Sequence, residues 1–490
     1  MKILVLNPPF LKRFSRAQRS PAVTKSGTLY FPIWLSYCVG VLEQDGFQVA
    51  FIDAPARNME RHHVLKLAAE FNPRMIVLDT STPSIQNDVS FAADLKLSLP
   101  QSFVVLVGTH VSALPEQTME TSNAIDAVAR GEYELTIRDL ARMLAGIDAV
   151  RPDDVDLKSI HGLSFQLDRT VVHNSDRNHM DNLDELPWVS RVYKKHLHIG
   201  DYYNADALYP MVTLITSRGC PFRCNFCVYP QTLFGRKYRF RSIADVADEM
   251  EFVLREFPAV KSIFFEDDTL TAHRGRCLHF ADTIIDRKLN IPWTANSRID
   301  IDIDVMRKMK AAGCRELCVG FESGNQLVLD SIKKGIRMEH MFQFMNDAKA
   351  AGIFIHGCFM LGFPGETAET IRDTIKLAIQ LDPDTVQFYP VMVYPGTEAY
   401  TDYEKKGWIT AQNFSQWVTP KGLHNCVIRN ETLNSHELVQ LCDEARRRFY
   451  LRPRYLAYKL IQGLTYPGEL IRTAKAARTF FRHIVVGSDI

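Results

Sequence analysis

Residues 212–227 read VTLITSRGCPFRCNFC, and this stretch decides how the rest of the chain is interpreted. The apolar run at 212–216 is typical of a buried strand, and a glycine and a proline mark a loop directly after it. Thiolates that lie close together in such a loop can wrap one face of an iron–sulfur cluster, and we expect Arg218 and Arg223 to favour the thiolate form. The loop carries three cysteines with the spacing CxxxCxxC, namely Cys220, Cys224 and Cys227.

A zinc site is the competing interpretation of these cysteines. Structural zinc commonly takes four ligands in two CxxC pairs, and the sequence offers no second pair. Three thiolates instead leave one iron of a cluster open to a further ligand. The remaining cysteines of the ten are scattered, and 490 residues can bury a large core without disulfides, so we expect a reduced, cytoplasmic protein.

The pattern of a short apolar run followed by an amphipathic stretch continues after this loop. Six such units predict a partial (β/α)6 barrel of TIM type over residues 206–410, with its chemistry at the mouth formed by the carboxyl ends of the strands. The expected strands lie at 212–216, 262–266, 292–295, 317–321, 354–360 and 385–391.

The same alternation precedes the loop, over residues 1–145. It predicts an α/β doubly wound sheet of the flavodoxin-like or Rossmann kind, in which ligands bind beyond the carboxyl ends of the strands. The expected strands are 3–6, 49–52, 75–78, 103–107 and 124–129, and the expected helices are 34–45, 61–70, 86–98 and 132–145.

Two regions fall outside these patterns. Residues 146–205 are polar and weakly periodic, and we interpret them as a linker with a short hairpin near 163–173. Residues 411–490 predict a basic helical region at the C-terminus.

Charge is unevenly distributed along the chain. The net charge is +1, but residues 446–482 carry ten Lys or Arg and one acid, which leaves 48 basic and 56 acidic residues elsewhere. This balance excludes an overall nucleic-acid footprint. The basic residues alternate with aromatic and aliphatic ones, as in a helix that contacts anionic lipid; pairing of the arginines with acids of the body is the alternative that stays open. No apolar stretch reaches ~18 residues and no signal-peptide pattern occurs, so membrane association is expected only at the surface.

The cysteine loop and the motifs after it carry a family resemblance. FFEDDT at 264–269, WTANSR at 293–298, GFESG at 320–324, MLGFPGET at 360–367 and QFY at 387–389 follow in strand order. The chain thereby resembles radical S-adenosylmethionine (SAM) enzymes. The resemblance implies that the three cysteines ligate a 4Fe-4S cluster whose open iron binds SAM, and that anaerobic reduction cleaves SAM to a 5′-deoxyadenosyl radical. The SAM contacts that it implies are Glu266, Asp267, Asp268, Arg298, Glu322, Ser323, Gly362 and Gln387.

Residues 1–145 resemble the cobalamin-binding modules of one subgroup of that family. GTHVSALP at 108–115 matches the pattern GGxHxxxxP with one glycine replaced, and RGEYE at 130–134 matches a recurrent RGExE turn. No DxHxxG sequence occurs, so we expect cobalamin without a histidine ligand from the protein. Because one glycine is replaced, a module that keeps the fold without the cofactor stays open. The implied cobalamin contacts are Asn7, Ser81, Thr82, Gly108, His110 and Gly131.

The resemblance leaves the reaction open. Methyl transfer to an unactivated carbon of a lipid or natural product is the function we favour, with a flavodoxin or ferredoxin as electron donor. The alternative is oxidative cyclisation or carbon–carbon bond formation, as in the anaerobic magnesium-protoporphyrin ester cyclase and hopanoid-pathway enzymes. A non-catalytic iron–sulfur or zinc scaffold is a third hypothesis, which the retained SAM loops disfavour. We expect packing roles for Tyr229, Cys314, Cys318, His356, Tyr389 and Tyr394.

Overall fold

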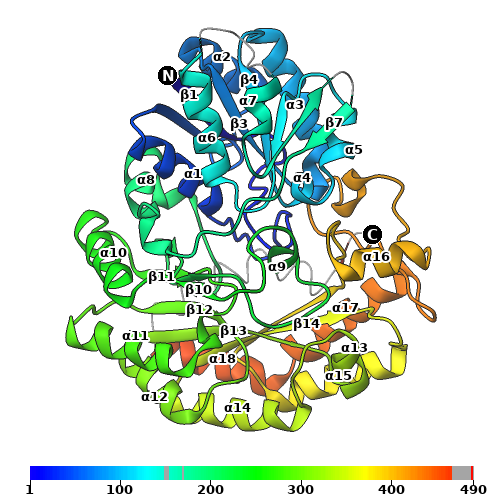
Figure 1. The fold of residues 1–490 in the computed structure, drawn as a ribbon. Coiled ribbons are helices and arrows are strands. Elements are labelled where there is room, and N and C mark those ends of the chain that lie inside the picture. The colour runs from blue at the N-terminus through cyan, green and yellow to red at the C-terminus, as the bar shows by residue number, and fades with distance from the viewer. Residues whose placement is uncertain (148–153, 168–169, 466–486, 489–490) are drawn as a thin grey trace.

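A computed structural model describes residues 1–147, 154–167, 170–465 and 487–488, and it contains two sheet-based modules and a helical C-terminal region (Figure 1). The first module has a seven-stranded sheet in the order β2-β1-β3-β4-β5-β6-β7. Its first five strands are parallel and in the flavodoxin-like order, which confirms the predicted doubly wound arrangement. These strands are β1 (Lys2–Asn7), β2 (Gln48–Asp53), β3 (Met75–Thr80), β4 (Phe103–Gly108) and β5 (Ala127–Ala129).

Alternate residues of β1 face opposite sides of this sheet. Ile3 and Val5 belong to the core on one face, and Leu4 and Leu6 belong to the core on the other. Because both faces are buried, the strand reads in the sequence as a continuous apolar run. The predicted fifth strand began too early, since β5 starts at Ala127. The helices that cover the two faces are α1 (Ile33–Gln44) and α6 (Glu134–Ala145) on one side and α2 (Arg61–Phe71), α3 (Ile85–Ser98), α4 (Thr109–Ala113) and α5 (Pro115–Glu120) on the other.

The hairpin expected near 163–173 extends this first sheet. It consists of β6 (Leu163–Leu167) and β7 (Thr170–His173), and β6 pairs antiparallel with β5. Helix α7 (Asp154–Lys158) precedes the hairpin, and α8 (Val189–His196), which follows it, packs against α1.

The second module is an open barrel of six parallel strands in sequence order, which confirms the predicted partial barrel. Figure 1 shows α10, α11, α12 and α14 along its outer edge, with the first module above it. The strands are β8 (Met211–Leu214), β11 (Ser262–Phe265), β12 (Trp293–Ser297), β13 (Cys314–Glu322), β14 (Phe354–Leu361) and β15 (Thr385–Pro390). The helices are α9 (Val228–Thr232), α10 (Ile243–Glu256), α11 (Arg274–Asp286), α12 (Ile303–Ala311), α13 (Gln326–Ser331), α14 (Met338–Ala351) and α15 (Ala368–Leu381).

The C-terminal region closes one edge of the barrel. It follows α16 (Glu398–Lys405) and comprises α17 (Ser435–Tyr450) and α18 (Pro453–Thr465), and α17 packs against β15 and α15. The hydroxyl of Tyr450 donates to the carbonyl oxygen of Val386 on β15 (2.6 Å). Among the described residues we find no helix with the length and apolar character needed to span a bilayer.

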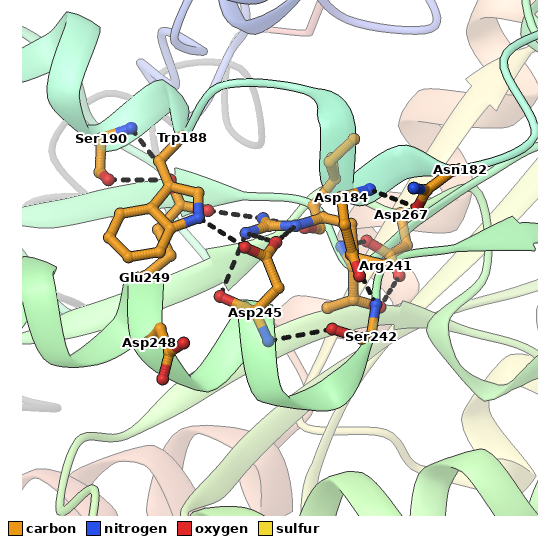
Figure 2. Close-up of polar contacts among 12 residues, drawn as sticks. Asn182, Asp184, Trp188, Ser190, Arg241, Ser242, Asp245, Asp248, Glu249 and Asp267 are labelled. Atoms are coloured by element: carbon orange, nitrogen blue, oxygen red, sulfur yellow. Dashed lines mark hydrogen bonds and ion pairs between the residues drawn. The ribbon is translucent and has the colours of Figure 1, made fainter.

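A buried charge network fastens residues 182–190 of the linker to the barrel (Figure 2). Arg241 forms ion pairs with Glu249 (2.5 Å) and Asp245 (2.6 Å). Trp188 of the linker donates its indole N–H to the same Asp245 carboxylate (2.8 Å). Ser190 of the linker donates its backbone N–H (3.1 Å) and its hydroxyl (2.8 Å) to Glu249, so the carboxylates that neutralise Arg241 also hold the linker against α10.

Candidate active site

Buried side chains fix the residues that lead from β8 into the cysteine loop. Asp267, at the end of β11, accepts hydrogen bonds from the backbone N–H and the hydroxyl of Thr216 (both 2.6 Å) and from the hydroxyl of Ser217 (2.7 Å). Arg276 donates to the hydroxyl and the carbonyl oxygen of Thr216 (both 2.9 Å). Both carboxylate oxygens of Asp267 accept hydrogen bonds from Thr216 or Ser217, so this side chain stabilises the residues that lead into the cysteine loop.

Arg218 directly precedes the glycine and the first cysteine of the loop, but it does not line the cavity that the three thiols share. Its fully buried guanidinium pairs with Glu132 (2.5 Å) and Glu134 (2.6 Å) of the first module. Arg239 joins the same cluster through Glu132 (2.8 Å). The expectation that Arg218 favours the thiolates is therefore wrong. The RGEYE sequence at 130–134 instead forms an ionic clamp between the modules, which we call the RGEYE clamp.

The three cysteines line one cavity of about 230 Å³ at the carboxyl ends of the barrel strands. Burial, followed by the Asp268 carboxylate, raises the pKa of the Cys220 thiol to about 11 and that of Cys227 further still. Because metals bind the thiolate, these thiols lose their protons together with metal binding. The cavity is completed by Arg19, Phe222, Asn296, Arg298, Cys318, Glu322, Lys334, Cys358, Met360, Tyr389 and Tyr394, among others.

A cationic side chain lies near each of these thiols. Positive charge beside a cysteine favours the thiolate that a cluster needs. Two of the cations belong to the barrel, and the third comes from the chain between β1 and α1. The pairs, each close enough for one group to influence the pKa of the other, are Arg298 with Cys220, Lys334 with Cys224, and Arg19 with Cys227.

Two carboxylates beside Arg19 have unused acceptor capacity. Arg19 donates to Oε1 of Glu266 (2.5 Å) and Oδ1 of Asp268 (3.4 Å). Oε2 of Glu266 and Oδ2 of Asp268 are buried without a hydrogen-bond partner within the described residues. Burial raises the pKa of both carboxyl groups, and Arg19 opposes that rise. Buried acceptors without donors mark an incomplete site, and an ammonium group such as that of SAM would complete it.

Glu322, at the end of β13, supplies a further ion pair at the cavity. It pairs with Lys334 (2.6 Å), and its backbone has φ of +66°, an uncommon conformation for a residue other than glycine. Such strain collects at functional sites. Gly320 makes the pair sterically feasible, because a Cβ there would lie 2.1 Å from Oε1 of Glu322.

The structure brings some of the predicted SAM contacts to the cavity and leaves others outside its lining. Asp268, Arg298 and Glu322 lie with the cysteines. Ser323 is fully buried, and its hydroxyl lies 3.4 Å from Glu366. Outside the lining also lie Gly362, whose N–H donates to Glu366 (2.7 Å), and Gln387, which is solvent-exposed.

Sequence reasoning missed several residues of the cavity. Arg19 and Lys334 were not assigned, and Cys318, Tyr389 and Tyr394 were assigned to packing although all three line the cavity. Strand alternation could have found Cys318, because it lies two residues before Gly320 on the same face of β13. No local signal marks Arg19, whose partners lie about half the chain away.

The predicted cobalamin contacts gather at the carboxyl ends of the first sheet, where they bond to other residues of the chain. Asn7 donates to Asp53 (2.8 Å) and accepts from Arg16 (2.7 Å). The hydroxyl of Thr82 lies 3.1 Å from Nδ1 of His110, and burial lowers the pKa of that imidazole to about 3. The remaining contacts are Ser81, which bonds with Ser84, Gly108, which lies against the carbonyl of Thr80, and Gly131, whose N–H donates to Ser112.

Residues 8–32 cover these strand ends. Phe14 is fully buried there, and the Arg16 guanidinium forms a buried ion pair with Asp88 (2.6 Å). In this conformation the Arg16 guanidinium bonds to Asn7, at the end of β1, and to Ser84, which follows β3. A separate cavity of about 700 Å³ opens beside His110, between α3 and residues 400–417.

The cavity at the cysteines does fit a cluster with an open iron. One loop supplies three thiols, and cations adjoin them. Of the two carboxylates beside Arg19 with an unpaired buried oxygen, Asp268 lines this cavity, whereas Glu266 lies outside its lining.

Two family models and several known proteins match large parts of this chain. The family model of the radical SAM superfamily matches residues 214–378, and that of the B12 binding domain matches residues 19–141. An uncharacterised methyltransferase of Pyrococcus horikoshii is 32% identical over 457 residues, which cover 93% of this chain and 94% of the relative. The anaerobic magnesium-protoporphyrin IX monomethyl ester cyclase of Rubrivivax gelatinosus is 26% identical over 87% of this chain and 75% of the relative.

Solved structures share the fold. The radical SAM methyltransferase TsrM from Kitasatospora setae, with tryptophan and a SAM analogue bound, gives a TM-score of 0.67 at 19% identity, covering 83% of this chain and 76% of that chain. The cobalamin-dependent radical enzyme OxsB, with aqua-cobalamin and SAM bound, gives 0.70 at 15% identity, covering 100% and 73%. Two family models and a relative 32% identical over nearly the whole chain place this protein in the radical SAM superfamily: it belongs to the cobalamin-dependent enzymes that carry a B12-binding domain.

Proposed function

We propose that this enzyme transfers a methyl group to an unactivated carbon of a lipid or natural product, using SAM, a 4Fe-4S cluster and cobalamin. The observation that carries the proposal is the single cavity shared by three cysteine thiols and by a carboxylate with an unpaired oxygen. The relative at 32% identity is named a methyltransferase, which favours this outcome over other radical reactions.

The residues of the cavity have different roles in this proposal. Cys220, Cys224 and Cys227 hold the cluster, which when bound supplies the electron that cleaves SAM to methionine and a 5′-deoxyadenosyl radical. Asp268, which lines the cavity, would accept a hydrogen bond from the SAM ammonium, with the unpaired oxygen of Glu266 as a second candidate acceptor. A flavodoxin or ferredoxin delivers the electron to the cluster.

Arg298 is suited to the SAM carboxylate. Its guanidinium is held by Asp300 (2.7 Å) and by the carbonyl oxygen of Lys334 (2.9 Å), so it faces the cavity in one orientation. A planar guanidinium held in this way recognises a carboxylate through two parallel bonds. The weakly polar wall suits a largely apolar substrate and consists of Cys318, Cys358, Met360 and Tyr389.

Oxidative cyclisation is the second candidate, because the cyclase of Rubrivivax gelatinosus aligns over 87% of this chain. The two reactions differ in the fate of the SAM methyl group. Methyl transfer moves it to the product, whereas cyclisation leaves it in methionine.

The test is anaerobic reconstitution with iron, sulfide and cobalamin, followed by incubation with a chemical reductant, SAM labelled as CD3 and lipid extracts as acceptors. We expect 5′-deoxyadenosine, S-adenosylhomocysteine and a CD3-labelled lipid by mass spectrometry. Release of 5′-deoxyadenosine without S-adenosylhomocysteine would favour cyclisation. No 5′-deoxyadenosine from cluster-loaded protein would contradict radical chemistry altogether.

Helix α18 adds a peripheral membrane contact to the proposal. Leu456, Leu460 and Leu464 follow one another at four-residue spacing and are 54%, 64% and 75% exposed. They lie within the strongly basic stretch 446–482. Exposed apolar side chains among basic ones match the surface of an anionic bilayer, where a lipid-like substrate resides.

The packing alternative applies to the part of the basic stretch nearest the barrel. Arg446 pairs with Asp443, and Arg452 pairs with Asp382 (2.8 Å). Phe449 is fully buried. Packing and lipid contact therefore involve different residues.

Sedimentation with vesicles of phosphatidylcholine and phosphatidylserine tests the contact. We expect the wild type to pellet with these vesicles, more at low salt, and the double variant Leu460→Ser/Leu464→Ser to lose most of that binding. Leu327→Ser, which removes an 80% exposed leucine from α13, is the matched control. Equal, negligible pelleting by all three proteins would end the membrane proposal.

A further inference from the structure

Arg19 reaches the cluster cavity from the other module. It lies between β1 and α1, whereas its ion-pair partners Glu266 and Asp268 follow β11 of the barrel. Its Nη2 also donates to the backbone carbonyl oxygen of Asp267 (3.0 Å). The side chain is 30% exposed and lines the cavity. Three acceptors thus hold this guanidinium in one orientation beside the cysteines.

The chain on either side of Arg19 is fastened to the barrel. The hydroxyl of Tyr229 donates to the carbonyl oxygen of Ala17 (2.9 Å), and the Tyr229 ring centroid lies 5.2 Å from the Arg19 guanidinium carbon. The hydroxyl of Ser20 bonds with that of Tyr394 (2.8 Å). Anchors at both neighbours restrict the positions that the Arg19 side chain can take.

Arg16, three residues earlier, is anchored in the first module instead. It pairs with Asp88 (2.6 Å), and both side chains are fully buried. Two arginines of one short segment are therefore held by carboxylates of two different modules. The position of Arg19 in the cavity depends on the docking of the first module onto the barrel.

The charge of Arg19 acts on the third cysteine of the loop. Arg19 and Cys227 line the same cavity, so the guanidinium charge lies beside the place of the cluster. Reduction of a cluster held by Cys227 adds one negative charge at this place, which a nearby cation stabilises. Without Arg19, the carboxylates of Glu266 and Asp268 would be left uncompensated at the same place.

We propose that Arg19 is a positioning residue that raises the reduction potential of the cluster held by Cys220, Cys224 and Cys227, and thereby ties cluster reduction to the docking of the N-terminal module. This inference rests on the cluster site of the proposed function. It involves neither the substrate nor cobalamin.

The test is a redox titration of the reconstituted full-length protein, followed by electron paramagnetic resonance at mildly alkaline pH without SAM. In Arg19→Gln the reduction equilibrium should move at least tenfold toward the oxidised cluster, which is ~59 mV for a one-electron couple. Arg19→Lys keeps the charge and should recover most of that shift. Lys12→Gln, which removes an exposed cation from the same segment, is the matched control and should leave the potential unchanged.

Asp268→Asn provides a change of opposite sign. It removes a negative charge from the cavity, so the potential should rise rather than fall. This variant also decides the matter if Arg19→Gln does not fold, as judged by the thermal unfolding of the cluster-free chain.

Two outcomes would overturn the inference. One is Arg19→Gln with a full complement of iron and the wild-type potential. The other is Arg19→Lys or Asp268→Asn with the same downward shift as Arg19→Gln, because charge would then not be the cause. Failure of the wild type to assemble a cluster would instead contradict the proposed function, so the two failures are distinguishable.

Discussion

The carboxyl ends of the parallel strands differ between the two large sheets of this molecule. At the carboxyl ends of the first sheet, Asn7, Thr82 and His110 bond to other residues of the chain, and residues 8–32 lie over them. At the mouth of the barrel, Glu266 and Asp268 each keep one unpaired carboxylate oxygen, and Asp268 lines an open cavity. Both edges collect polar residues because parallel strands end together. The difference teaches that a carboxylate oxygen without a donor beside a cavity, as at Asp268, distinguishes the barrel mouth from an edge whose polar side chains are already bonded to one another.

The largest effect should come from the cysteines of the barrel mouth. Replacing Cys220, Cys224 or Cys227 with alanine removes a cluster ligand, so SAM cleavage should fall below detection in an anaerobic assay for 5′-deoxyadenosine. Cys314→Ala, a buried cysteine outside the cavity, is the control. A triple-alanine protein that still loads iron and cleaves SAM would show that the site is misassigned.

The adjacent acids Asp267 and Asp268 should separate structure from binding. Asp268→Asn removes a charged acceptor, so SAM affinity measured by calorimetry should fall tenfold or more, about 1.5–3 kcal/mol. Asp267→Asn should instead lower the free energy of unfolding by about 1–3 kcal/mol in a denaturant titration, because it disturbs the bonds from Thr216 and Ser217. Equal effects of the two variants on both quantities would contradict this division.

Arg16 tests whether the buried ion pair with Asp88 stabilises the segment that covers the strand ends of the first sheet. Arg16→Met leaves the buried Asp88 carboxylate without its cation, so the free energy of unfolding should fall by about 3–5 kcal/mol. The double variant Arg16→Met/Asp88→Leu should recover part of that loss. An Arg16→Met protein that is as stable as the wild type would contradict this role of the ion pair.

A smaller, pH-dependent effect is expected inside the barrel. Although burial lowers it, the Asp206 carboxylate raises the pKa of His356, to about 10, and the imidazole is also bonded to Thr385 (2.8 Å). The unfolded histidine has a pKa of about 6.5, so the stabilisation is complete below that pH and is lost as the pH rises to about 10. Asp206→Asn should therefore cost more stability at mildly acidic pH than at strongly alkaline pH, measured by urea unfolding.

The smallest effect is expected at His110. Its imidazole is buried against Thr82, and its low pKa of about 3 keeps it neutral. The absorption spectrum of bound cobalamin should be the same in the wild type and in His110→Ala. A spectrum of histidine-ligated cobalt that is lost in the variant would overturn the expectation of cobalamin without a protein ligand.

The sequence predicted the strands and the cysteine loop well because both are local patterns. Apolar runs located all eleven parallel strands of the two sheets to within a few residues, and CxxxCxxC located the thiols. The pairing of Arg19 with Glu266 could not be predicted, because the two residues lie 247 positions apart and no periodicity relates them. Nor could the sequence distinguish Asp267 from Asp268, since only their contacts differ.

The RGEYE clamp limits how this chain can be divided. Glu132 and Glu134 neutralise Arg218 and Arg239, which are fully buried next to the cysteine loop. A shortened protein that began near residue 206 would carry these two guanidinium groups without their counterions, at the entrance to the cluster loop. In such a fragment the two guanidinium groups would have to become solvated or the loop would have to change its conformation. A barrel that is excised for engineering, or joined to a foreign B12-binding domain, therefore has to keep two glutamates at the positions of Glu132 and Glu134.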